Sequence, residues 1–475
     1  MKSGASNILK LLSVFNKNSN NIAITDIIKN RKITYKEFLN LSTKLTSYLR
    51  YKKKLKIGDK ILINFENSLE FLVLIFSCLL GGFIAVPIEP NLPKNRKKLI
   101  KELIKPKIEI KNLNLKKINS KKISLKKFDV VPFLILFTSG TTGDPKGILL
   151  ENDKYISSAM SYSKLCDYDS NSRIYHCLPM FYNAGMANLF FSSLSSGSNL
   201  IIGPKISPLN LISLIENLKV NKISSTHLTP EILNSICKIY NNRKIKKDEL
   251  QNIQIISTAS FLHENTVSNF EKIFNIRILN CYGITEAGGP LTLQNWEDTF
   301  YENSVGRHSK EIKFKILQNK FGDKILVKTP YMMMGYITYK NKLENIKLSK
   351  SYFDTGDIGK YKESQLFITG RRQDIIKKGG EILSLNFLDN ICKKIKNIEE
   401  CVHVNVEDIN KGSKIYLFVK FKKILNLEME IELLLASLKK KIRNIELPDR
   451  IFPVPDIPKL FNGKINKIKL KNIYL

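Results

Sequence analysis

The chain has 475 residues and 43% of them are apolar, which is enough for buried cores and too long for one small domain. Its 77 Lys and Arg residues outnumber 43 Asp and Glu residues and give a formal net charge of +34. The seven cysteines are scattered without a C-x-x-C pair, which argues against a disulfide framework or a zinc site and predicts a reducing, cytoplasmic environment.

The positive charge lacks the pattern of a nucleic-acid-binding surface. Lysine clusters at 52–54, 116–127 and 439–441 lie between apolar residues, without interleaved aromatic side chains. Most of the basic residues are Lys, and the chain is rich in Ile and Asn, as codon usage in an A/T-rich genome would produce. We expect solvated lysine faces and no specific nucleic acid partner, and a weak attraction to acidic membranes or carrier proteins stays open.

The N-terminal part predicts helices and strands in alternation. Ile8–Phe15 is apolar, but Lys10 interrupts it and no small-residue cleavage site follows, so we expect no signal peptide. Tyr35–Leu49 has helical spacing, and Lys60–Asn64 has the composition of a strand.

The segment Phe71–Ile88 is nearly uncharged and about as long as the shortest membrane-spanning helices. Gly81 and Gly82 divide it, however, and Pro87 closes it. We therefore predict a buried helix that ends near Leu80, a glycine turn and a buried strand at 83–86, and no transmembrane span.

The alternation continues to about Ile358 and predicts an α/β region with parallel sheets. Two further helices are expected at 153–165, with Asp153 as N-cap, and at 208–218. After Arg371 the pattern changes to a compact tail with a strand at 415–421 and a helix at 430–442.

The stretch Leu136–Leu150, LFTSGTTGDPKGILL, carries the clearest chemistry. A strand-like run stops at Thr138 and is followed by glycines, hydroxyl side chains and Lys146. Glycines let backbone N–H groups turn toward an anion, while the hydroxyls and the lysine add donors and positive charge. The loop is predicted to cradle a triphosphate; the alternative is a surface turn without a ligand. It is not a Walker A loop, because Pro145 stands where that motif needs its second Gly.

Further motifs follow this loop in order, and the set resembles the adenylate-forming (AMP-binding) superfamily of acyl-CoA synthetases, peptide-synthetase adenylation domains and firefly luciferase. The resemblance spans nearly the whole chain from Ile33 onward. It is carried by Asn280–Glu286 (N-x-Y-G-x-T-E), Gly322–Tyr336 (G-E-L to G-Y), Phe353–Asp357 (T-G-D), Gly370–Glu381 (G-R-x-x-D-x-I-K-x-x-G) and Pro458–Ile465 (P-x-x-x-x-G-K). Six ordered motifs are stronger evidence than any one alone.

The resemblance implies an α/β fold of the acyl-CoA synthetase and luciferase type. It has a large N-terminal domain of parallel and mixed sheets with helices, and a small mobile C-terminal α+β domain. By resemblance we place the AMP-binding domain at 1–372 and the mobile domain at 373–475.

The family reaction joins a carboxylate to the α-phosphate of ATP, releases pyrophosphate and passes the acyl group to a thiol. A carboxylate is ionised at neutral pH, so the first step needs no general base. It needs cations, because two like charges about 4 Å apart repel by roughly 4 kcal/mol at an effective dielectric of about 20. The resemblance implies ATP and Mg²⁺ as cofactors, with CoA or the phosphopantetheine arm of a carrier protein as acceptor.

The resemblance also implies a role for each motif residue. Tyr282 is expected against the adenine ring, and Asp357 is expected to accept hydrogen bonds from the ribose hydroxyls. The catalytic set is Lys464 for the α-phosphate and carboxylate, Thr285 for the α-phosphate, Glu286 for Mg²⁺, and Lys377 in the second step. The remaining nucleotide-binding set is Thr138, Ser139, Gly140, Thr141, Thr142, Gly143 and Lys146 for the β- and γ-phosphates, with Asn280, Gly283 and Arg371. Taken singly, each would have an ordinary structural interpretation, such as a core aromatic, a turn residue or a surface charge.

The second step is expected to depend on rotation of the C-terminal domain about a hinge just after Arg371, which exchanges Lys464 for the face that carries Lys377. The hinge residue here is Gln373 in place of the usual Asp or Lys, and a hinge needs free backbone dihedrals rather than a particular charge. Two departures from the family bear on acceptor docking: Leu385 replaces a usual Pro, and Asn466-Lys467 replaces the usual basic pattern.

The segment Leu178–Gly185 occupies the place where amino-acid-activating relatives carry an Asp for the substrate amine, and it contains no Asp. An unpaired ammonium is costly in an apolar pocket, so we expect an amine-free carboxylic acid, such as a fatty acid. The first hypothesis is an AMP-forming acid–thiol ligase that makes acyl-CoA. The alternatives are a ligase that loads an acyl carrier protein, a stand-alone adenylation domain, and a non-catalytic nucleotide-binding scaffold.

Overall fold

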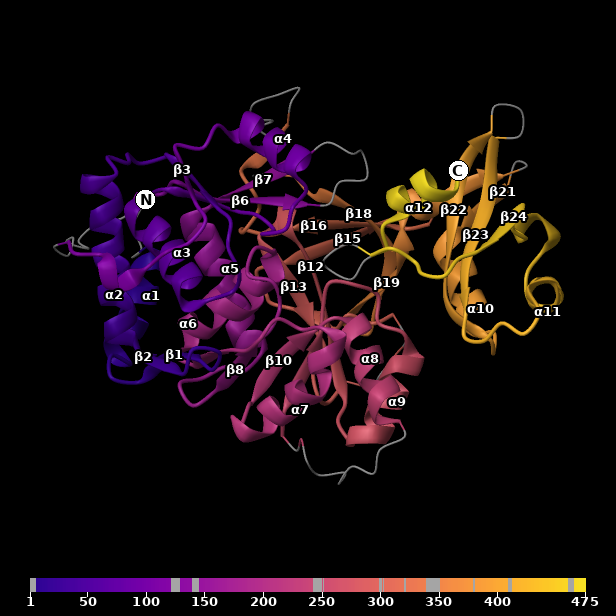
Figure 1. Ribbon diagram of the computed structural model, residues 1–475, viewed down its shortest axis with the longest axis horizontal. Coiled ribbons are helices and arrows are strands. Elements are labelled where there is room, and N and C mark those ends of the chain that lie inside the picture. The colour runs from indigo at the N-terminus through magenta and orange to yellow at the C-terminus, as the bar shows by residue number, and fades with distance from the viewer. Residues whose placement is uncertain are drawn as a thin grey trace. The chain divides into compact units, whose positions relative to one another are not determined.

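The computed structural model describes residues 6–120, 129–138, 145–241, 250, 252–298, 301, 303–319, 322–338, 351–378, 381–408, 412–459 and 465–475 (Figure 1). Contacts divide the chain into two compact units, one made of residues 1–313 and 328–352 and the other of 314–327 and 353–475. The second unit thus includes strands that precede residue 373, because they pair with one another in one sheet. The hinge at 372/373 stays a prediction.

The first unit contains a mixed sheet of order β14-β13-β12-β11-β10-β8-β9-β1-β2. Its central strands are parallel, while β2, β13 and β14 are antiparallel to their neighbours. The strands are β1 Ile22–Asp26, β2 Arg31–Thr34, β8 Arg173–His176, β9 Asn199–Ile202, β10 Ser225–Leu228, β11 Gln254–Ser257, β12 Ile278–Ile284, β13 Gly289–Leu293 and β14 Arg307–His308. Parallel pairing of this kind matches the alternation of helices and strands in the sequence.

A second sheet of the same unit has the order β17-β7-β6-β4-β3-β5. Its strands are β3 Lys60–Ile63, β4 Ile84–Pro87, β5 Ile108–Ile110, β6 Pro132–Thr138, β7 Lys146–Glu151 and β17 Gly335–Ile337. β6 and β7 are antiparallel neighbours. The predicted phosphate loop therefore connects two adjacent strands, and β7 begins at its lysine.

Helices pack on both sheets of this unit (Figure 1). They are α1 Asn7–Lys17, α2 Tyr35–Ser47, α3 Leu69–Gly81, α4 Lys94–Ile104, α5 Asn152–Leu165, α6 Ser192–Ser196, α7 Leu211–Val220, α8 Pro230–Tyr240 and α9 Glu264–Phe274. α4 packs on the second sheet. On the first sheet, helices lie on both faces. α7, α8 and α9 bury one face of that sheet in an apolar core. α5 packs its Tyr162 and Cys166 on the other face, against strands β11 to β13.

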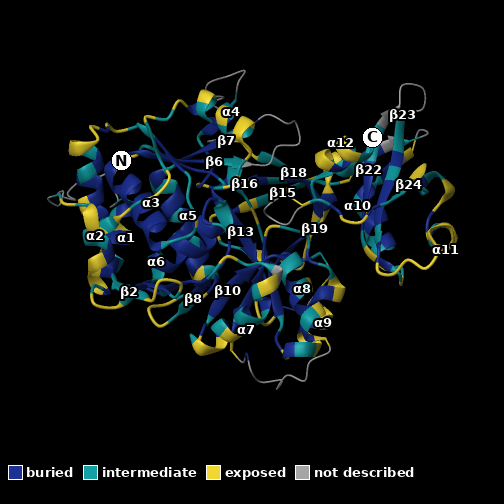
Figure 2. Cartoon of the chain, viewed as in Figure 1, coloured by how far each residue is buried: buried dark blue, intermediate teal, exposed yellow. Residues whose placement is uncertain are grey.

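α3 confirms the prediction of a buried helix in the apolar segment. The Ser68 side chain accepts a hydrogen bond from the Phe71 N–H at its start, and Gly82 ends it with a φ of 68°. Every residue of the helix is buried, as the dark blue ribbon in Figure 2 shows. Glycine fits this end because L side chains rarely adopt a positive φ. Strand β4 follows two residues later, as expected.

Two other predicted helices are present with different ends: α2 ends at Ser47 rather than at Leu49, and α5 has a different start. α2 begins with a capping box in which Thr34 and Glu37 satisfy each other's backbone N–H groups. α5 begins one residue earlier than predicted, and Asp153 is not its N-cap, so that prediction is wrong. The Asp153 carboxylate instead accepts hydrogen bonds from the backbone and side-chain amides of Asn7 at 2.6 and 2.8 Å, which fastens α1 to α5. The contact joins residues 146 positions apart, and local sequence does not reveal it.

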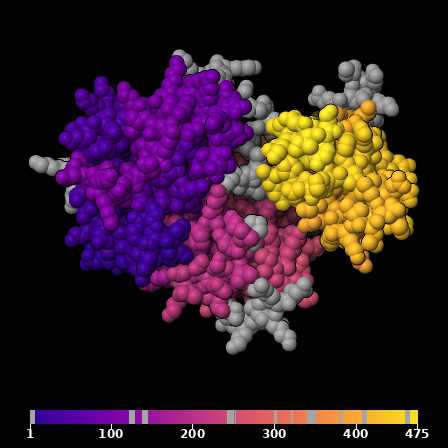
Figure 3. All heavy atoms as spheres, viewed as in Figure 1, coloured from indigo at the N-terminus to yellow at the C-terminus, as the bar shows by residue number. Residues whose placement is uncertain are grey.

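The second unit is built from two sheets of its own, in the orders β15-β16-β18-β19 and β21-β20-β23-β22, with β24 beside β23. Its elements are β15 Lys313–Leu317, β16 Lys324–Lys328, β18 Phe353–Lys362, β19 Gln365–Arg371, β20 Ile375–Lys378, β21 Glu381–Ser384, α10 Leu385–Lys393, β22 Ile398–Asp408, β23 Gly412–Phe421, α11 Leu427–Lys439, β24 Arg450–Pro453 and α12 Lys467–Tyr474. Leu470 of α12 packs against strands β22 and β23. The C-terminal residues of the unit are yellow in Figure 3.

The predicted fold class is confirmed: mixed sheets with helices form a large unit, and a smaller α+β unit follows. All seven cysteines are buried free thiols. No helix within the described ranges combines the length and the apolar composition that a membrane crossing requires.

Candidate active site

The motif Asn280–Glu286 lies at the carboxyl end of β12, where the chain turns back into β13. A short helical turn holds Thr285 and Glu286, and Gly288 closes it with a φ of 86°. Gly283 faces Pro290 across the β12–β13 ladder, and a Cβ at Gly283 would lie 2.4 Å from the Gly289 carbonyl oxygen. Any side chain there would push the two strands apart. The motif glycine is therefore required by backbone packing, and the turn presents the partly exposed Tyr282, Thr285 and Glu286.

Lys146, Tyr336 and Glu286 form a compact polar cluster in the first unit. The Tyr336 hydroxyl donates to Glu286 Oε1 at 3.1 Å. The Lys146 Nζ lies 3.3 Å from the centroid of the Tyr336 ring, a close cation–π contact. The structure thus brings together the last residue of the predicted phosphate loop and the predicted metal ligand, which are 140 residues apart in the sequence numbering.

Backbone hydrogen bonds fix this arrangement. β17 pairs with β7 so that Tyr336 faces Ile148, and Lys146, two residues earlier, lies on the same side of the sheet. The Met333 N–H donates to the Glu286 carbonyl at 2.9 Å, and the Met334 N–H donates to the Leu149 carbonyl at 2.8 Å. The segment before β17 is therefore tied to the end of β12 and to β7 at once.

Asn280 has a structural task in this region. Its side chain is buried and donates to the Ser304 carbonyl at 3.0 Å, and its backbone N–H donates to the Gln294 side chain at 2.9 Å. These bonds hold the chain that leads to β14 against β12. Contact of Asn280 with a nucleotide stays a prediction.

In the second unit, Asp357 and Arg371 are direct partners across the β18–β19 ladder. Arg371 Nε lies 3.2 Å from Asp357 Oδ1, and the Asp357 side chain is almost fully buried while that of Arg371 is 47% exposed. The Asp357 N–H donates to Thr355 Oγ1, which in turn donates to the Ile325 carbonyl. The two motif residues predicted around the ribose are thus held together by the strands that carry them.

A second ion pair, Asp354–Arg372, lies beside this one at the surface. Burial by itself raises the pKa of Asp354, but hydrogen bonds from Arg372 and from the Gly356 N–H outweigh it, so the pKa is lowered. Asp354 is therefore a carboxylate at neutral pH.

The predicted hinge Gln373 is exposed, and the next residue contacts the C-terminal segment. Lys467 Nζ donates to Asp374 Oδ1 at 2.7 Å. Lys459 and Ile465 form a β-bridge, and the Asn466 N–H donates to the Pro458 carbonyl at 2.7 Å. These bonds fix the residues on either side of Lys464 within the second unit.

Several predicted site residues lie outside the described residues. They are Ser139, Gly140, Thr141, Thr142, Gly143 and Lys464, together with the side chains of Thr138 and Lys377. Their roles stay predictions.

The segment predicted beside the acid is closely packed. The Tyr155 hydroxyl donates to Asn183 Oδ1 at 2.7 Å, and the buried His176 ring bonds the Gly185 carbonyl at 2.9 Å. A Cβ at Gly288 would lie 2.4 Å from the Tyr331 carbonyl oxygen, and one at Gly289 would lie 3.1 Å from the Ala187 Cβ. A side chain at either glycine would therefore crowd its neighbours.

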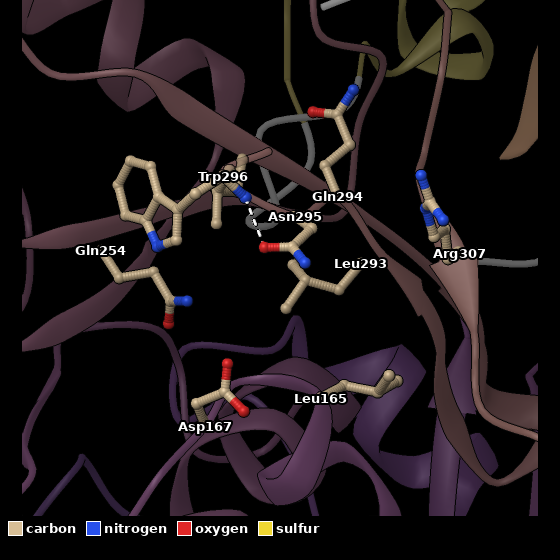
Figure 4. A pocket seen from close by; sticks show the side chains of 9 residues that line it. Leu165, Asp167, Gln254, Leu293, Gln294, Asn295, Trp296 and Arg307 are labelled. Atoms are coloured by element: carbon tan, nitrogen blue, oxygen red, sulfur yellow. Dashed lines mark hydrogen bonds between the residues drawn. The ribbon is translucent and has the colours of Figure 1, made fainter. Parts of the chain in front are cut away.

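A separate hollow of about 120 Å³ lies beside the C-terminal end of α5 (Figure 4). Leu165, Leu279 and Leu293 line it with Trp296, and no predicted site residue does. Its polar side chains largely bond within the protein: Gln254 Oε1 accepts from Ser225, Asn295 Oδ1 accepts from the Trp296 N–H, and Arg307 pairs with Asp298. The hollow is distinct from the motif residues.

Tyr336 ends the motif Gly322–Tyr336 but has no predicted role in the sequence. The Asp374–Lys467 contact was not predicted either. An aromatic residue at the end of a conspicuous G-Y pair was the available signal for Tyr336. Its partners come from β7 and from the end of β12, and only the pairing of distant segments reveals them.

Residues 13–131 and 130–337 match the AMP-binding enzyme family, and the chain belongs to this family. Its relatives are CoA ligases, so the prediction of an enzyme of the acid–thiol ligase class is confirmed. The oxalate–CoA ligase of Saccharomyces cerevisiae is 26% identical over 70% of this chain and 62% of its own length. The 2-succinylbenzoate–CoA ligase of Staphylococcus epidermidis is 23% identical over 96% of this chain and 95% of its own length.

The fold agrees with this membership. The crystal structure of ATP-bound MatB from Rhodopseudomonas palustris superposes with a TM-score of 0.86 at 19% identity and covers 98% of each chain. At that level of identity the likeness supports the fold and leaves the substrate to other arguments.

Proposed function

We propose that the chain is an AMP-forming ligase that activates an amine-free carboxylic acid with ATP and transfers the acyl group to the thiol of coenzyme A. The carrying observation is the juxtaposition of Lys146 and Glu286 through Tyr336. A cation suited to terminal phosphates lies over the face of this ring, and a carboxylate suited to a metal ion accepts a hydrogen bond from its hydroxyl. Adenylation needs this pair because its obstacle is charge repulsion.

Glu286 fits the requirements of Mg²⁺. The carboxylate is partly exposed, and only its Oε1 is hydrogen-bonded to Tyr336, which leaves Oε2 as an oxygen ligand. Mg²⁺ is usually held by one or two carboxylates together with substrate phosphates and water rather than by an all-protein cage. The described residues contain no group of three His, Cys, Asp or Glu side chains placed to hold a metal. When bound, Mg²⁺ would neutralise phosphate charge.

In the first step a carboxylate oxygen of the acid bonds the α-phosphorus, and the bond from that phosphorus to the β-phosphate bridging oxygen breaks, so that pyrophosphate leaves. The acid arrives ionised, and no proton has to move. Lys146 and the loop before it would hold the β- and γ-phosphates, Thr285 would contact the α-phosphate, and Lys464 would lie between phosphate and carboxylate. Their common task is to place positive charge where negative groups meet.

In the second step the thiolate sulfur bonds the acyl carbon, and the bond from that carbon to the phosphate oxygen of AMP breaks. The proposal includes rotation of residues 373–475 about Gln373, which withdraws Lys464 and brings in Lys377. Gln373 is exposed, so its dihedrals can change without disturbing a core. The Asp374–Lys467 bond would carry the Lys464 segment along with the rotating part.

The acid is proposed to be compact and free of amines. Leu178–Gly185 offers no carboxylate for an ammonium. A compact acid is proposed because oxalate and 2-succinylbenzoate, the acids in the names of the two relatives, are not fatty acids.

Coenzyme A is the preferred acceptor because both relatives are named for it. A carrier protein is the alternative acceptor. We also propose a reducing, cytoplasmic setting, which suits the buried free thiols.

Acid-dependent exchange of labelled pyrophosphate into ATP tests the first step over a panel of short, dicarboxylic, aromatic and long-chain acids. Adding CoA or a carrier protein to the responding acid then distinguishes the two acceptors. If the protein binds ATP but none of the tested acids supports pyrophosphate exchange, it is a nucleotide-binding scaffold.

A further inference from the structure

We propose that Tyr336 is a positioning residue that couples the phosphate-binding lysine to the metal-binding carboxylate. The inference rests on the proposed function, in which the Tyr336 side chain has no role of its own. The ring holds the Lys146 ammonium and the hydroxyl holds Glu286. One side chain therefore sets the positions of two groups of opposite charge.

The position of the ring is determined by the backbone around it. Tyr336 is 9% exposed, lies in the middle of β17 and is paired with β7 on one side. The Met333 N–H bond to the Glu286 carbonyl fixes the approach of this segment to the turn after β12. A rigid aromatic on a paired strand is better suited to placing two partners than a side chain on a free loop.

The chemistry of the contact keeps both charges available. Lys146 and Glu286, both among the described residues, form no ion pair with each other: the ammonium contacts the face of the Tyr336 ring, and the carboxylate contacts its hydroxyl. A direct pair would neutralise the carboxylate that Mg²⁺ needs and the ammonium that phosphate needs. A phenol hydroxyl orients Glu286 Oε1 without bringing a charge, and the ring face attracts the ammonium without accepting its protons.

Two substitutions separate the two halves of the side chain. Tyr336→Phe keeps the ring and removes the hydroxyl, so the Mg²⁺ concentration needed for half-maximal ATP binding should rise about ten-fold, as is typical when a partner of a metal ligand is lost. Tyr336→Leu removes the ring as well, so ATP affinity at saturating Mg²⁺ should fall by a further factor of about five. Tyr361→Phe removes a hydroxyl that donates to the Ser364 carbonyl at an exposed turn, and it should alter neither quantity.

The experiment measures ATP binding by titration calorimetry at a series of Mg²⁺ concentrations, without any acid, for the full-length chain and these variants. Glu286→Gln and the double variant with Tyr336→Phe complete a cycle. The proposal expects the double variant to require no more Mg²⁺ than Glu286→Gln alone, because the hydroxyl acts through that carboxylate. A merely structural hydroxyl would give additive effects.

Three results would overturn the proposal: an unchanged Mg²⁺ requirement in Tyr336→Phe, additivity in the cycle, or a strongly lowered unfolding temperature in Tyr336→Phe, which would show that the hydroxyl holds the fold. Failure of the proposed function looks different. ATP binding would then depend on Mg²⁺ and on Tyr336 as expected, and yet none of the tested acids would support pyrophosphate exchange by the wild-type protein.

Discussion

Arg371 Nε lies 3.2 Å from Asp357 Oδ1, and the two residues face each other across the β18–β19 ladder. The arginine occupies one carboxylate oxygen and fixes the orientation of the other. Since Arg371 is half exposed and Asp357 is almost fully buried, the carboxylate is the group that the pair positions.

Asp357→Ala should raise the KM for ATP by about 100-fold or more with little change in the unfolding temperature. The reason is that Asp357 is proposed to accept two hydrogen bonds from ribose hydroxyls, and a hydrogen bond to a charged acceptor contributes about 1.5–3 kcal/mol. Asp354→Ala is the matched control, because its ion pair with Arg372 is at the surface and should change the KM by less than about two-fold. Steady-state pyrophosphate release gives both values, and equal effects would contradict the assignment of Asp357.

Lys464→Ala and Gln373→Pro should separate the two half-reactions. The lysine substitution removes the cation proposed for the α-phosphate, so pyrophosphate release should fall by about 100-fold or more while thioester formation from a synthetic acyl-adenylate persists. Proline fixes φ at position 373 and should do the reverse. Both activities can be followed with the purified acyl-adenylate. Normal overall turnover in Gln373→Pro would contradict rotation about this residue.

Gly283→Ala should destabilise the turn that carries Thr285 and Glu286. Its Cβ would lie 2.4 Å from the Gly289 carbonyl oxygen, and relief requires the strands to shift, at a cost of about 1–3 kcal/mol in the free energy of unfolding. Gly370→Ala is the control, because a Cβ there meets only ordinary contacts at 3.4 Å or more. Urea unfolding of the two variants checks the difference, and equal stability would show that β12 and β13 have room to part.

His176 and His227 predict a specific loss of stability in mild acid. Burial lowers the pKa of His176 to about 4, and burial together with the nearby His176 lowers the pKa of His227 to about 3. Unfolded histidine titrates near about 6.5, so below that pH the unfolded chain binds protons that the folded chain does not. As the pH is lowered from 6.5 to 5, each histidine should therefore reduce the free energy of unfolding. The rate of this loss should approach about 1.4 kcal/mol per pH unit.

Denaturant unfolding at pH 7, 6 and 5 measures this slope. Replacing His176 and His227 by Gln should reduce it, while His308→Gln, on a partly exposed edge strand, should leave it nearly unchanged. A slope that does not depend on the two buried histidines would contradict the explanation.

Local features were the ones that the sequence could predict. The helix α3, its end at Gly82 and strand β4 follow from a cap residue, a glycine and an apolar run that lie within a few positions of one another. Asp153 was assigned wrongly as a cap because its partner, Asn7, is far away in the sequence. The pairing of β16 with β18, and the contact of Tyr336 with Glu286, likewise depend on segments that only the folded chain brings together.

The site divides in the same way. Motif order gave the candidate residues, and the structure places two of them, Asp357 and Arg371, in contact. Motif order could not predict that Asn280 bonds Ser304 or that Gly288 and Gly289 are closely packed, because both facts depend on how backbone segments approach one another.

Exchange of radiolabelled pyrophosphate into ATP, measured acid by acid with wild-type protein and with Glu286→Gln, is the most direct test of the central claim. The account predicts exchange that requires Mg²⁺ and one compact amine-free acid, and that falls by about 100-fold in the variant. Absence of exchange with every acid, or full exchange without the Glu286 carboxylate, would contradict it.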